Sequence, residues 1–164
     1  MTRKDSSSSR RQSSSTVTIN RRARYDYDIL DTVEAGLVLK GTEIKSIRGR
    51  RVSLSDSYAR PSNGQMWLHN LHIDEYAPAS RENHDPKRPR KLLLHRAQID
   101  DLSRQVEQRG LTLVPLRLYV RNHVAKIELA VARGKKRFDK RRALIERERE
   151  REARAAIGSS GRGH

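Results

Sequence analysis

The sequence predicts a mainly β protein with helices: a small antiparallel OB-like β-barrel, two or three helices, and disordered basic tails. Several short segments alternate apolar and polar residues with the period of a half-buried strand. Two segments between them carry apolar residues at helical spacing and end at a glycine. A chain of 164 residues has room for one domain and its tails. We expect a Ser-rich leader at residues 1–19, the barrel at residues 20–132 and a basic tail at residues 133–164.

The barrel is expected to open with a strand and a short helix. Tyrosine and isoleucine alternate with aspartate over residues 24–29, and residues 37–39 continue the extended pattern. A helix is expected over residues 43–48, because Ile44 and Ile47 lie one turn apart and a glycine follows. Both isoleucines should face the core.

A β-hairpin and a long loop are expected next. Residues 52–60 and 65–73 flank Asn63-Gly64, and these two residue types tolerate the positive φ angles of a tight hairpin turn. Residues 77–91 are polar and contain prolines and several cations. Loops of this length inside a compact domain usually have a function.

A helix and a second hairpin complete the predicted barrel. Residues 97–109 place apolar side chains on one helical face, and Gly110 is a suitable end. Residues 116–121 and 126–131 alternate apolar and polar positions, and Asn122-His123 between them fits a tight turn. The order strand, helix, hairpin, helix, hairpin favours a small barrel with helices at its ends.

The positive charge is concentrated at the two ends of the chain. Residues 1–24 carry 7 basic and 1 acidic residues, residues 25–132 carry 17 and 14, and residues 133–164 carry 12 and 5. This distribution is typical of proteins that bind nucleic acid through arms. The leader has no capacity to form a core, so order should begin near Asn20. The tail buries too little to offset its ordering entropy, so it should order only on a polyanionic partner.

Other classes of function find little support. An anionic membrane is the competing partner for the basic ends, but the sequence contains no run of about 18 apolar residues and no secretory signal. Cysteine is absent, which excludes disulfides and Cys-ligated zinc. His69 and His72 would point to opposite faces of a strand and could not share a metal. With no phosphate-binding glycine loop or nucleophile–base pair, we expect a soluble cytoplasmic protein without enzymatic activity, cofactor or metal.

Two segments of the expected barrel offer cations for phosphate. The loop at residues 83–91 places arginine and lysine around a proline-stiffened turn, and arginine can hold a phosphate through two hydrogen bonds. The segment at residues 20–24 can add further contacts. The alternative for both segments is a solvated charged surface. The candidates are Asn20, Arg21, Arg22, Arg24, His84, Lys87, Arg88, Arg90 and Lys91.

The tail combines one aromatic ring with many charges. Phe138 has no core to join, and stacking on an RNA base, worth about 1–3 kcal/mol, is its natural role. The alternative is an unused apolar side chain. Opposite charges recur at helical spacing in the pairs Glu146–Arg149, Glu148–Arg151 and Glu150–Arg154. Each pair adds only about 0.2–0.5 kcal/mol, too little for a lone helix, so we expect a partly helical tail that orders on RNA.

Several long motifs occur in order along the chain. They are Asn20, Arg24-Tyr25-Asp26-Tyr27, Glu34-Ala35-Gly36-Leu37-Val38-Leu39-Lys40-Gly41-Thr42-Glu43-Ile44-Lys45-Ser46, Asp56-Ser57-Tyr58-Ala59-Arg60, Arg90-Lys91-Leu92-Leu93-Leu94-His95, Gly110-Leu111-Thr112-Leu113-Val114-Pro115-Leu116, Gly134-Lys135-Lys136 and Asp139-Lys140-Arg141. With these motifs the chain closely resembles the SsrA-binding protein (small protein B) family over about residues 19–157.

This resemblance implies an OB-like barrel that binds the tRNA-like domain of transfer-messenger RNA and carries it to a stalled ribosome. It implies no enzymatic activity, a monomer when bound, and elongation factor Tu as a further partner on the same RNA. Asn20, Glu34 and residues 83–91 would face the transfer-messenger RNA. The tail would lie in the decoding centre and the empty mRNA channel. Its expected ribosomal contacts are Arg133, Gly134, Lys135, Lys136, Phe138, Asp139, Lys140 and Arg141, with Ile157 as a late apolar contact.

The family often has His or Tyr where this chain has Phe138, which keeps the stacking ring and loses the polar atom. Two other classes of function stay open at this point. A generic basic RNA-binding or ribosome-assembly protein fits the charge distribution but not the long motifs. An RNA-processing enzyme on a barrel scaffold would need a catalytic constellation, and none is visible.

Overall fold

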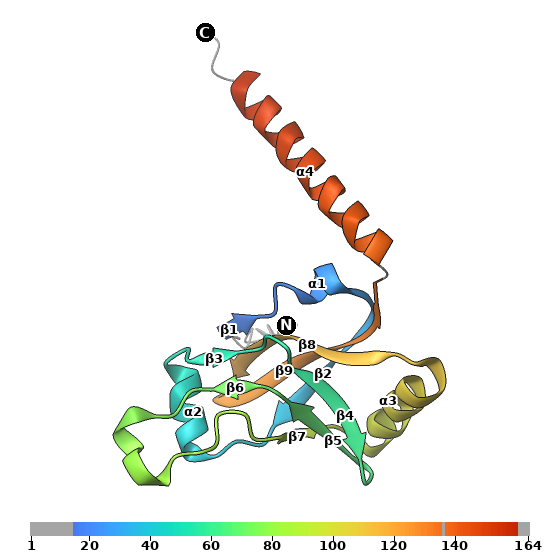
Figure 1. The fold of residues 1–164 in the computed structure, drawn as a ribbon. Helices are drawn as coiled ribbons and strands as arrows, with labels where there is room; N and C mark the ends of the chain where they lie inside the picture. Colours follow the sequence, from blue (N-terminus) through green and yellow to red (C-terminus); the bar gives the residue numbers. More distant parts are fainter. Residues whose placement is uncertain (1–14, 136, 161–164) are drawn as a thin grey trace, which may run out of the picture.

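The computed structural model describes residues 15–135 and 137–160 and shows a mainly β body with helices (Figure 1). The strands are β1 (Ser15–Ile19), β2 (Tyr27–Leu37), β3 (Val52–Ser53), β4 (Tyr58–Ser62), β5 (Gln65–His69), β6 (His72–Ile73), β7 (Arg90–Leu93), β8 (Thr112–Arg121) and β9 (Val124–Gly134). The α-helices are α1 (Ala23–Asp26), α2 (Gly41–Arg48), α3 (Arg96–Arg109) and α4 (Arg137–Ser160), and one 3₁₀-helix is η1 (Ala77–Glu82). No described helix is both long enough and apolar enough to span a bilayer.

Seven strands form one antiparallel sheet in the order β1-β8-β4-β5-β7-β2-β9, and β8 also pairs with β9. Because β8 and β9 pair, the six strands β8, β4, β5, β7, β2 and β9 form a closed ring, and β1 lies outside it on β8. The longest ladders are β2–β9 and the β8–β9 hairpin. The shortest strand pairing in the ring is between β4 and β8, where only Ala59 and Leu113 are paired. Strands β3 and β6 form a separate two-stranded sheet.

The two predicted hairpin turns are confirmed. Asn63 and Gly64, between β4 and β5, have φ angles of 52° and 71°. Asn122 and His123, between β8 and β9, have φ angles of 51° and 64°. Two successive positive φ angles match the twist of the flanking strands, which is why these short turns form.

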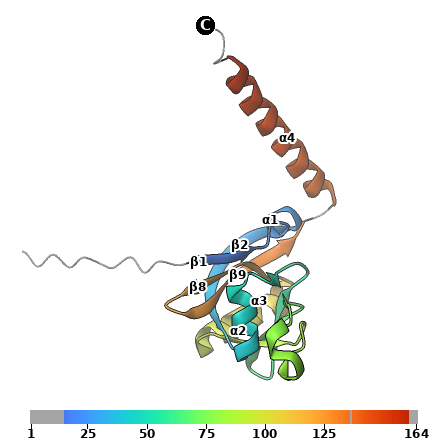
Figure 2. The same ribbon diagram turned by 90° about the vertical axis from the view of Figure 1, so that its left-hand side faces the viewer.

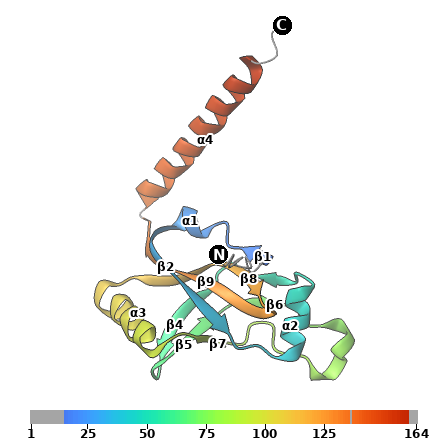
Figure 3. The ribbon, with the colours of Figure 1, turned by 180° about the vertical axis from the view of Figure 1, so that it is seen from behind.

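The core is aliphatic, as the shortage of aromatic residues predicts. Its fully buried side chains come from the inward positions of the closed ring, among them Met66, Leu68, Leu113, Ile127 and Leu129. Helices α2 and α3 lie at opposite ends of the body (Figure 3). The first contributes Ile47 to the core, and the second contributes Leu102.

A second, smaller core lies under α1. Ala23 of α1 packs with Val114, Leu116, Ala130 and Ala132, which belong to β8 and β9. The partly buried Tyr27 and Ile29 cover this cluster. Helix α1 is therefore fixed to the sheet by packing, and α4 leaves the body beside it (Figure 2).

The N-terminal boundary differs from the prediction. Residues 15–19 were expected in a disordered leader, but they form β1, which pairs with β8 from Ser15 to Ile19. Val17 packs against the main core. A strand can be this polar because its backbone hydrogen bonds and one apolar side chain hold it to the sheet edge. The rest of the leader, residues 1–14, lies outside the described residues.

The strand expected from residue 24 also differs, because residues 23–26 form the helical turn α1 and β2 begins only at Tyr27. The alternation of tyrosine and aspartate does not distinguish this turn from a strand. In α2 the expected inner face is partly wrong: Ile47 is buried, but Ile44 is 38% exposed and Glu43 is fully buried. Helix α3 and its left-handed Gly110 cap are confirmed.

The tail is more helical than predicted. Helix α4 runs continuously over Arg137–Ser160 in the chain alone, whereas the sequence predicted partial helix that forms on a partner. The segment contains no proline, and its glutamate and arginine side chains alternate at spacings that support a helix. Helix α4 projects away from the sheet (Figure 1). Its side chains from residue 141 onward are mostly exposed.

Candidate nucleic-acid interface

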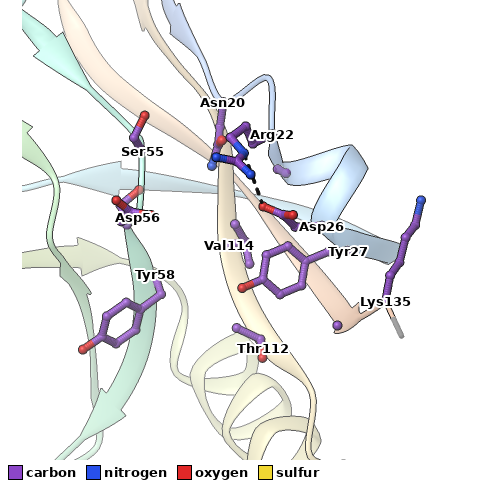
Figure 4. Close-up of a pocket in the computed structure, with 13 residues that line it drawn as sticks. Asn20, Arg22, Asp26, Tyr27, Ser55, Asp56, Tyr58, Thr112, Val114 and Lys135 are labelled. Carbon is purple, nitrogen blue, oxygen red and sulfur yellow. Dashed lines mark ion pairs between the residues drawn. The ribbon is translucent and has the colours of Figure 1, made fainter. Parts of the chain in front are cut away.

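A cleft of about 710 Å³ lies where the N-terminal arm (residues 20–24), the β3–β4 connection and the base of the tail meet (Figure 4). These three segments are far apart in the sequence. The cleft is lined by Asn20, Arg22, Ala23, Asp26, Tyr27, Ser55, Asp56, Ser57, Tyr58, Thr112, Val114, Gly134 and Lys135. Four predicted RNA-contact residues, from both the arm and the tail, are therefore brought to one place.

Backbone hydrogen bonds fix the arm beside β8. The Asn20 N–H donates to Leu116 O at 2.7 Å, and Asn20 Nδ2 donates to Pro115 O at 3.0 Å. The side-chain amide of Asn20 therefore positions the arm and is partly used before any RNA binds. The guanidinium of Arg22 lies 3.9 Å from Asp26 and is 80% exposed.

The base of the tail is tied to α1. The Lys135 N–H donates to Asp26 O at 2.9 Å, and Lys135 Nζ donates to Arg24 O at 3.1 Å. The same ammonium lies 4.0 Å from an oxygen of Asp28. These bonds set the point from which the tail leaves the body.

The arm and the end of β9, which border the cleft, carry exposed arginines, whereas the lining of the cleft holds Asp26 and Asp56 beside Arg22 and Lys135. Arg21, Arg24 and Arg133 are exposed, as is Arg22. Exposed guanidinium groups on fixed backbone are suited to bind phosphate oxygens with little loss of conformational freedom. The arm and the tail base therefore form one cationic surface.

The loop at residues 83–91 differs from the prediction. His84 and Arg90 are buried, with 2% and 0% exposure, and Arg90 belongs to β7. His84 lies between Thr42 Oγ1 and Ile73 O, at 2.9 Å from each. Because a carbonyl only accepts, His84 Nε2 donates to Ile73 O, and its Nδ1 shares a hydrogen bond with the threonine hydroxyl. His84 and Arg90 cannot contact RNA from these positions.

A buried carboxylate explains why the loop turns its cations inward. Arg90 Nε donates to Glu43 Oε2 at 2.6 Å, and Arg88 Nε donates to Glu43 Oε1 at 3.0 Å. Arg90 also donates to Leu71 O and Pro86 O. A buried charge is tolerated only when it is paired and hydrogen-bonded, and here the two guanidinium groups and the carboxylate satisfy one another.

The electrostatics of Glu43 follow from this arrangement. Burial by itself would raise the pKa of Glu43, but the hydrogen bonds from the Lys40 N–H, Arg88 and Arg90 outweigh burial and hold the pKa below its usual value. Glu43 thus stays ionised inside the protein. Among the loop cations, Lys87 is exposed and Lys91 is half-buried, so these two remain available to a partner.

Glu34, expected to face RNA, lies on the outer surface of β2 with its carboxylate 36% exposed. It accepts hydrogen bonds from the Tyr119 hydroxyl and from Arg121 Nη2. Its cross-strand neighbour Glu128 accepts from Arg117 Nε at 2.5 Å. Burial first, and then the hydrogen bond to Glu34, raise the pKa of Tyr119 to about 12.

Sequence reasoning missed the surroundings of Glu34. Gly36, two residues further along β2, pairs with Leu93 of β7 and with Lys126 of β9. Leu93 is 54% exposed, and Val38 and Val124 nearby along the same strands are 42% and 48% exposed. A signal was present for Lys126, which alternates with apolar residues along its strand, but residues 92–94 are all leucine and do not mark Leu93 as outward. Without the register, nothing places either residue beside Glu34.

The remaining tail candidates lie on or before α4. Phe138, Asp139 and Lys140 fall in its first turn, and Arg141 follows on an exposed position. Ile157 is 74% exposed near the end of the helix. Lys136 lies outside the described residues.

Within residues 15–135 and 137–160, no group of three or more histidine, aspartate or glutamate side chains could hold a metal ion. His69 stacks on Tyr58, and His72 bonds to Asp74 at 2.8 Å. Both histidines thus have structural partners: His69 on the neighbouring strand β4, and His72 at the residue that follows β6.

The chain is similar to known proteins over most of its length. The SmpB protein family model matches residues 17–159. An SsrA-binding protein of Frankia casuarinae is 55% identical over 144 residues, covering 88% of this chain and 91% of the relative. One of Thermobifida fusca is 55% identical over 146 residues, covering 89% and 91%. A solved structure described as tmRNA-SmpB, a journey to the center of the bacterial ribosome, has a TM-score of 0.63 at 49% identity and covers 77% of this chain and 93% of its own.

Proposed function

Because the chain belongs to the SmpB protein family, we propose that it is the RNA-binding adaptor of trans-translation. It binds the tRNA-like domain of transfer-messenger RNA and delivers it to stalled ribosomes, which leads to ribosome rescue and tagging of the nascent peptide. It acts in the cytoplasm by binding and not by catalysis. The closed ring of β8, β4, β5, β7, β2 and β9 supports an OB-like barrel as its scaffold.

We propose that the two described surfaces divide the work. The surface around Glu34, with Leu93, Lys126 and the loop cations Lys87 and Lys91, contacts transfer-messenger RNA. The arm at residues 20–24 also contacts transfer-messenger RNA, while the base of the tail and α4 contact ribosomal RNA in the decoding centre and the empty mRNA channel. An mRNA in that channel would compete with α4 both sterically and electrostatically. A tail that fits only an empty channel therefore reports that the message is missing.

The observation that carries this proposal is the position of the tail. Lys135 lines the cleft and is bonded to α1, so the base of the tail is a fixed point, and α4 projects away from the sheet (Figure 1). A tail base that is fixed to the body lets one protein hold an RNA on the body and probe a channel with α4. The family relatives named for SsrA binding and the tmRNA-SmpB structure support the choice of RNA.

The test is truncation of the chain after Lys135, which keeps the whole of β9 and its bond to α1. We expect binding of transfer-messenger RNA to persist, measured by gel shift at physiological salt, and peptide tagging on stalled ribosomes to be abolished. If both activities were lost, or both retained, the division of labour would be wrong.

A matched pair of substitutions tests the decoding-centre contact of the tail. Phe138→Ala should weaken ribosome engagement more than RNA binding in solution, because the ring is lost, whereas Phe138→His should have a mild effect. Sequencing the RNA that co-purifies with the full chain separates the adaptor from a generic binder. One dominant species with a tRNA-like end supports the adaptor, and a broad mixture opposes it.

A further inference from the structure

The outer face of β4, β5 and β7 carries a row of cations and rings, and its central members Arg60, Trp67 and His69 have no part in the proposed function. Arg60 of β4 pairs across the sheet with Trp67 of β5, and Trp67 pairs with Lys91 of β7. One step along the same strands, Tyr58 pairs with His69. We call Tyr58, Arg60, Trp67, His69 and Lys91 the Trp67 strip.

The strand alternation shows that the strip faces outward. Ala59, Met66, Leu68 and Leu92 occupy the intervening positions and are buried in the core. The members of the strip are exposed or half-buried. Trp67 packs against neither of the two hydrophobic clusters, although it is the only tryptophan of the chain.

The indole of Trp67 makes no cation–π contact with the cations of the strip. Within the described residues, the cation–π contacts join Lys45 to Tyr76 and Arg117 to Tyr119, and neither involves Trp67. No ion pair between described residues includes Arg60 or Lys91. The rings of Tyr58 and His69 do stack, with centroids 5.3 Å apart and an interplanar angle of 19°. The strip therefore offers one unused indole between two unpaired cations, beside a preformed aromatic pair.

This arrangement matches the chemistry of a single nucleic-acid strand. Each unpaired base has a flat face that can stack on a ring, and each nucleotide carries one phosphate for a cation. Residues two apart on a strand lie about 6.6 Å apart, so Trp67 and the Tyr58–His69 stack are spaced as successive binding positions. Tyr58 also lines the cleft that holds Arg22 and Lys135. The strip therefore continues from this cleft along β4 and β5.

We propose that the Trp67 strip binds an unpaired RNA segment, with a base stacked on Trp67 and its flanking phosphates held by Arg60 and Lys91. The strip is a binding surface beyond the adaptor role, and it does not depend on which RNA supplies the segment. A duplex is a poor ligand because its bases are already stacked on one another. An acidic peptide has the charge but lacks the rings.

The single tryptophan makes the test specific. The full chain is titrated with a short unstructured RNA of mixed A and C, carrying a fluorescent label, at near-physiological salt. Anisotropy of the label reports all binding, including binding to the tail, while Trp67 emission reports only its own surroundings. We expect saturable quenching of Trp67 by the single strand and little quenching by the same sequence as a duplex or by polyglutamate.

Substitutions separate stacking from charge. Trp67→Ala should weaken the binding that anisotropy reports by about ten-fold, whereas Trp67→Phe, which keeps a ring, should retain most of it. Arg60→Gln should shift the quenching midpoint of Trp67 several-fold to higher RNA concentration. Arg104→Gln, which removes an equal charge from the exposed surface of α3, is the control and should leave the midpoint unchanged.

Three outcomes would overturn the proposal. They are unquenched Trp67 emission under conditions where anisotropy shows the RNA bound, equal quenching by duplex or polyglutamate, and an equal midpoint for Arg60→Gln and Arg104→Gln. Failure of the adaptor role would look different, because it would appear in transfer-messenger RNA selection and tagging while the quenching by single strands persisted.

Discussion

The loop at residues 83–91 and the arm at residues 20–24 are both basic in the sequence, yet the structure uses them in opposite ways. In the loop, Arg88 and Arg90 turn inward and are held by a buried carboxylate. In the arm, Arg22 and its neighbours point outward at the rim of a cleft. The same residue type is a structural tie in one segment and an available phosphate ligand in the other.

This difference teaches that one acidic residue decides which cations are available. Glu43 lies 45 residues before Arg88 and carries no sign in the sequence that it will be buried. It occupies the helix position next to Ile44, and the helix turns the carboxylate inward and the isoleucine outward. A count of cations in a loop therefore overestimates its capacity to bind RNA when a buried carboxylate of the core pairs with some of those cations.

The largest expected effect breaks this comparison at Glu43. Glu43→Gln leaves Arg90 buried without a counter-charge, and removal of one partner from a buried ion pair typically costs about 3–5 kcal/mol. We expect a loss of this size in the free energy of unfolding, measured by urea denaturation. Glu75→Gln, an exposed carboxylate in the same region, is the control and should change stability very little. Equal losses in the two variants would mean that the loop is not held by Glu43.

Acid should remove part of the same stabilisation. The pKa of Glu43 is held below its usual value of 4.5 in the folded protein, so the unfolded chain binds the proton more readily. The contribution of its charge is therefore complete above about pH 4.5 and is lost as the pH falls through the lower pKa of the folded state. Urea denaturation at a series of acidic pH values should show a smaller loss for Glu43→Gln than for the natural chain. Parallel curves would contradict this assignment.

The next prediction compares two adjacent cations of the loop. Arg88→Met removes a hydrogen-bonded partner of Glu43 and should cost about 2 kcal/mol of stability. Lys87→Met removes an exposed charge and should leave stability within about 0.5 kcal/mol of the natural chain. Lys87→Met should lose more affinity for transfer-messenger RNA than Arg88→Met, when both variants are measured under conditions where they are folded. A larger stability loss for Lys87→Met would reverse the structural assignment of the two cations.

The parts of the molecule that are local in sequence could be predicted, and those that depend on register could not. The backbone preferences of Asn63-Gly64 predict a turn, and that of Gly110 predicts a helix end. Both predictions are confirmed. The inward turn of Arg90 depends on β7 pairing with β2 and β5, which the sequence does not state. The proximity of Leu93 and Lys126 to Glu34 likewise depends on three strands being in one register.

The smallest expected effect sharpens the comparison between Glu43, a buried carboxylate held by two partners, and Glu34, an exposed one. Tyr119→Phe removes one hydrogen bond to Glu34 but leaves Arg121 in place, so it should cost only about 1 kcal/mol. The pKa of Tyr119 is raised to about 12 in the folded protein, above its usual value of 10.0. Its contribution to stability is therefore complete below about pH 10 and is lost as the pH rises towards 12. The tyrosinate absorbance of the natural chain should contain a late step that Tyr119→Phe lacks. If the two titration curves coincided near pH 12, the Tyr119 hydroxyl would be neither buried nor bonded to Glu34, and Arg121 would be the partner that Glu34 keeps.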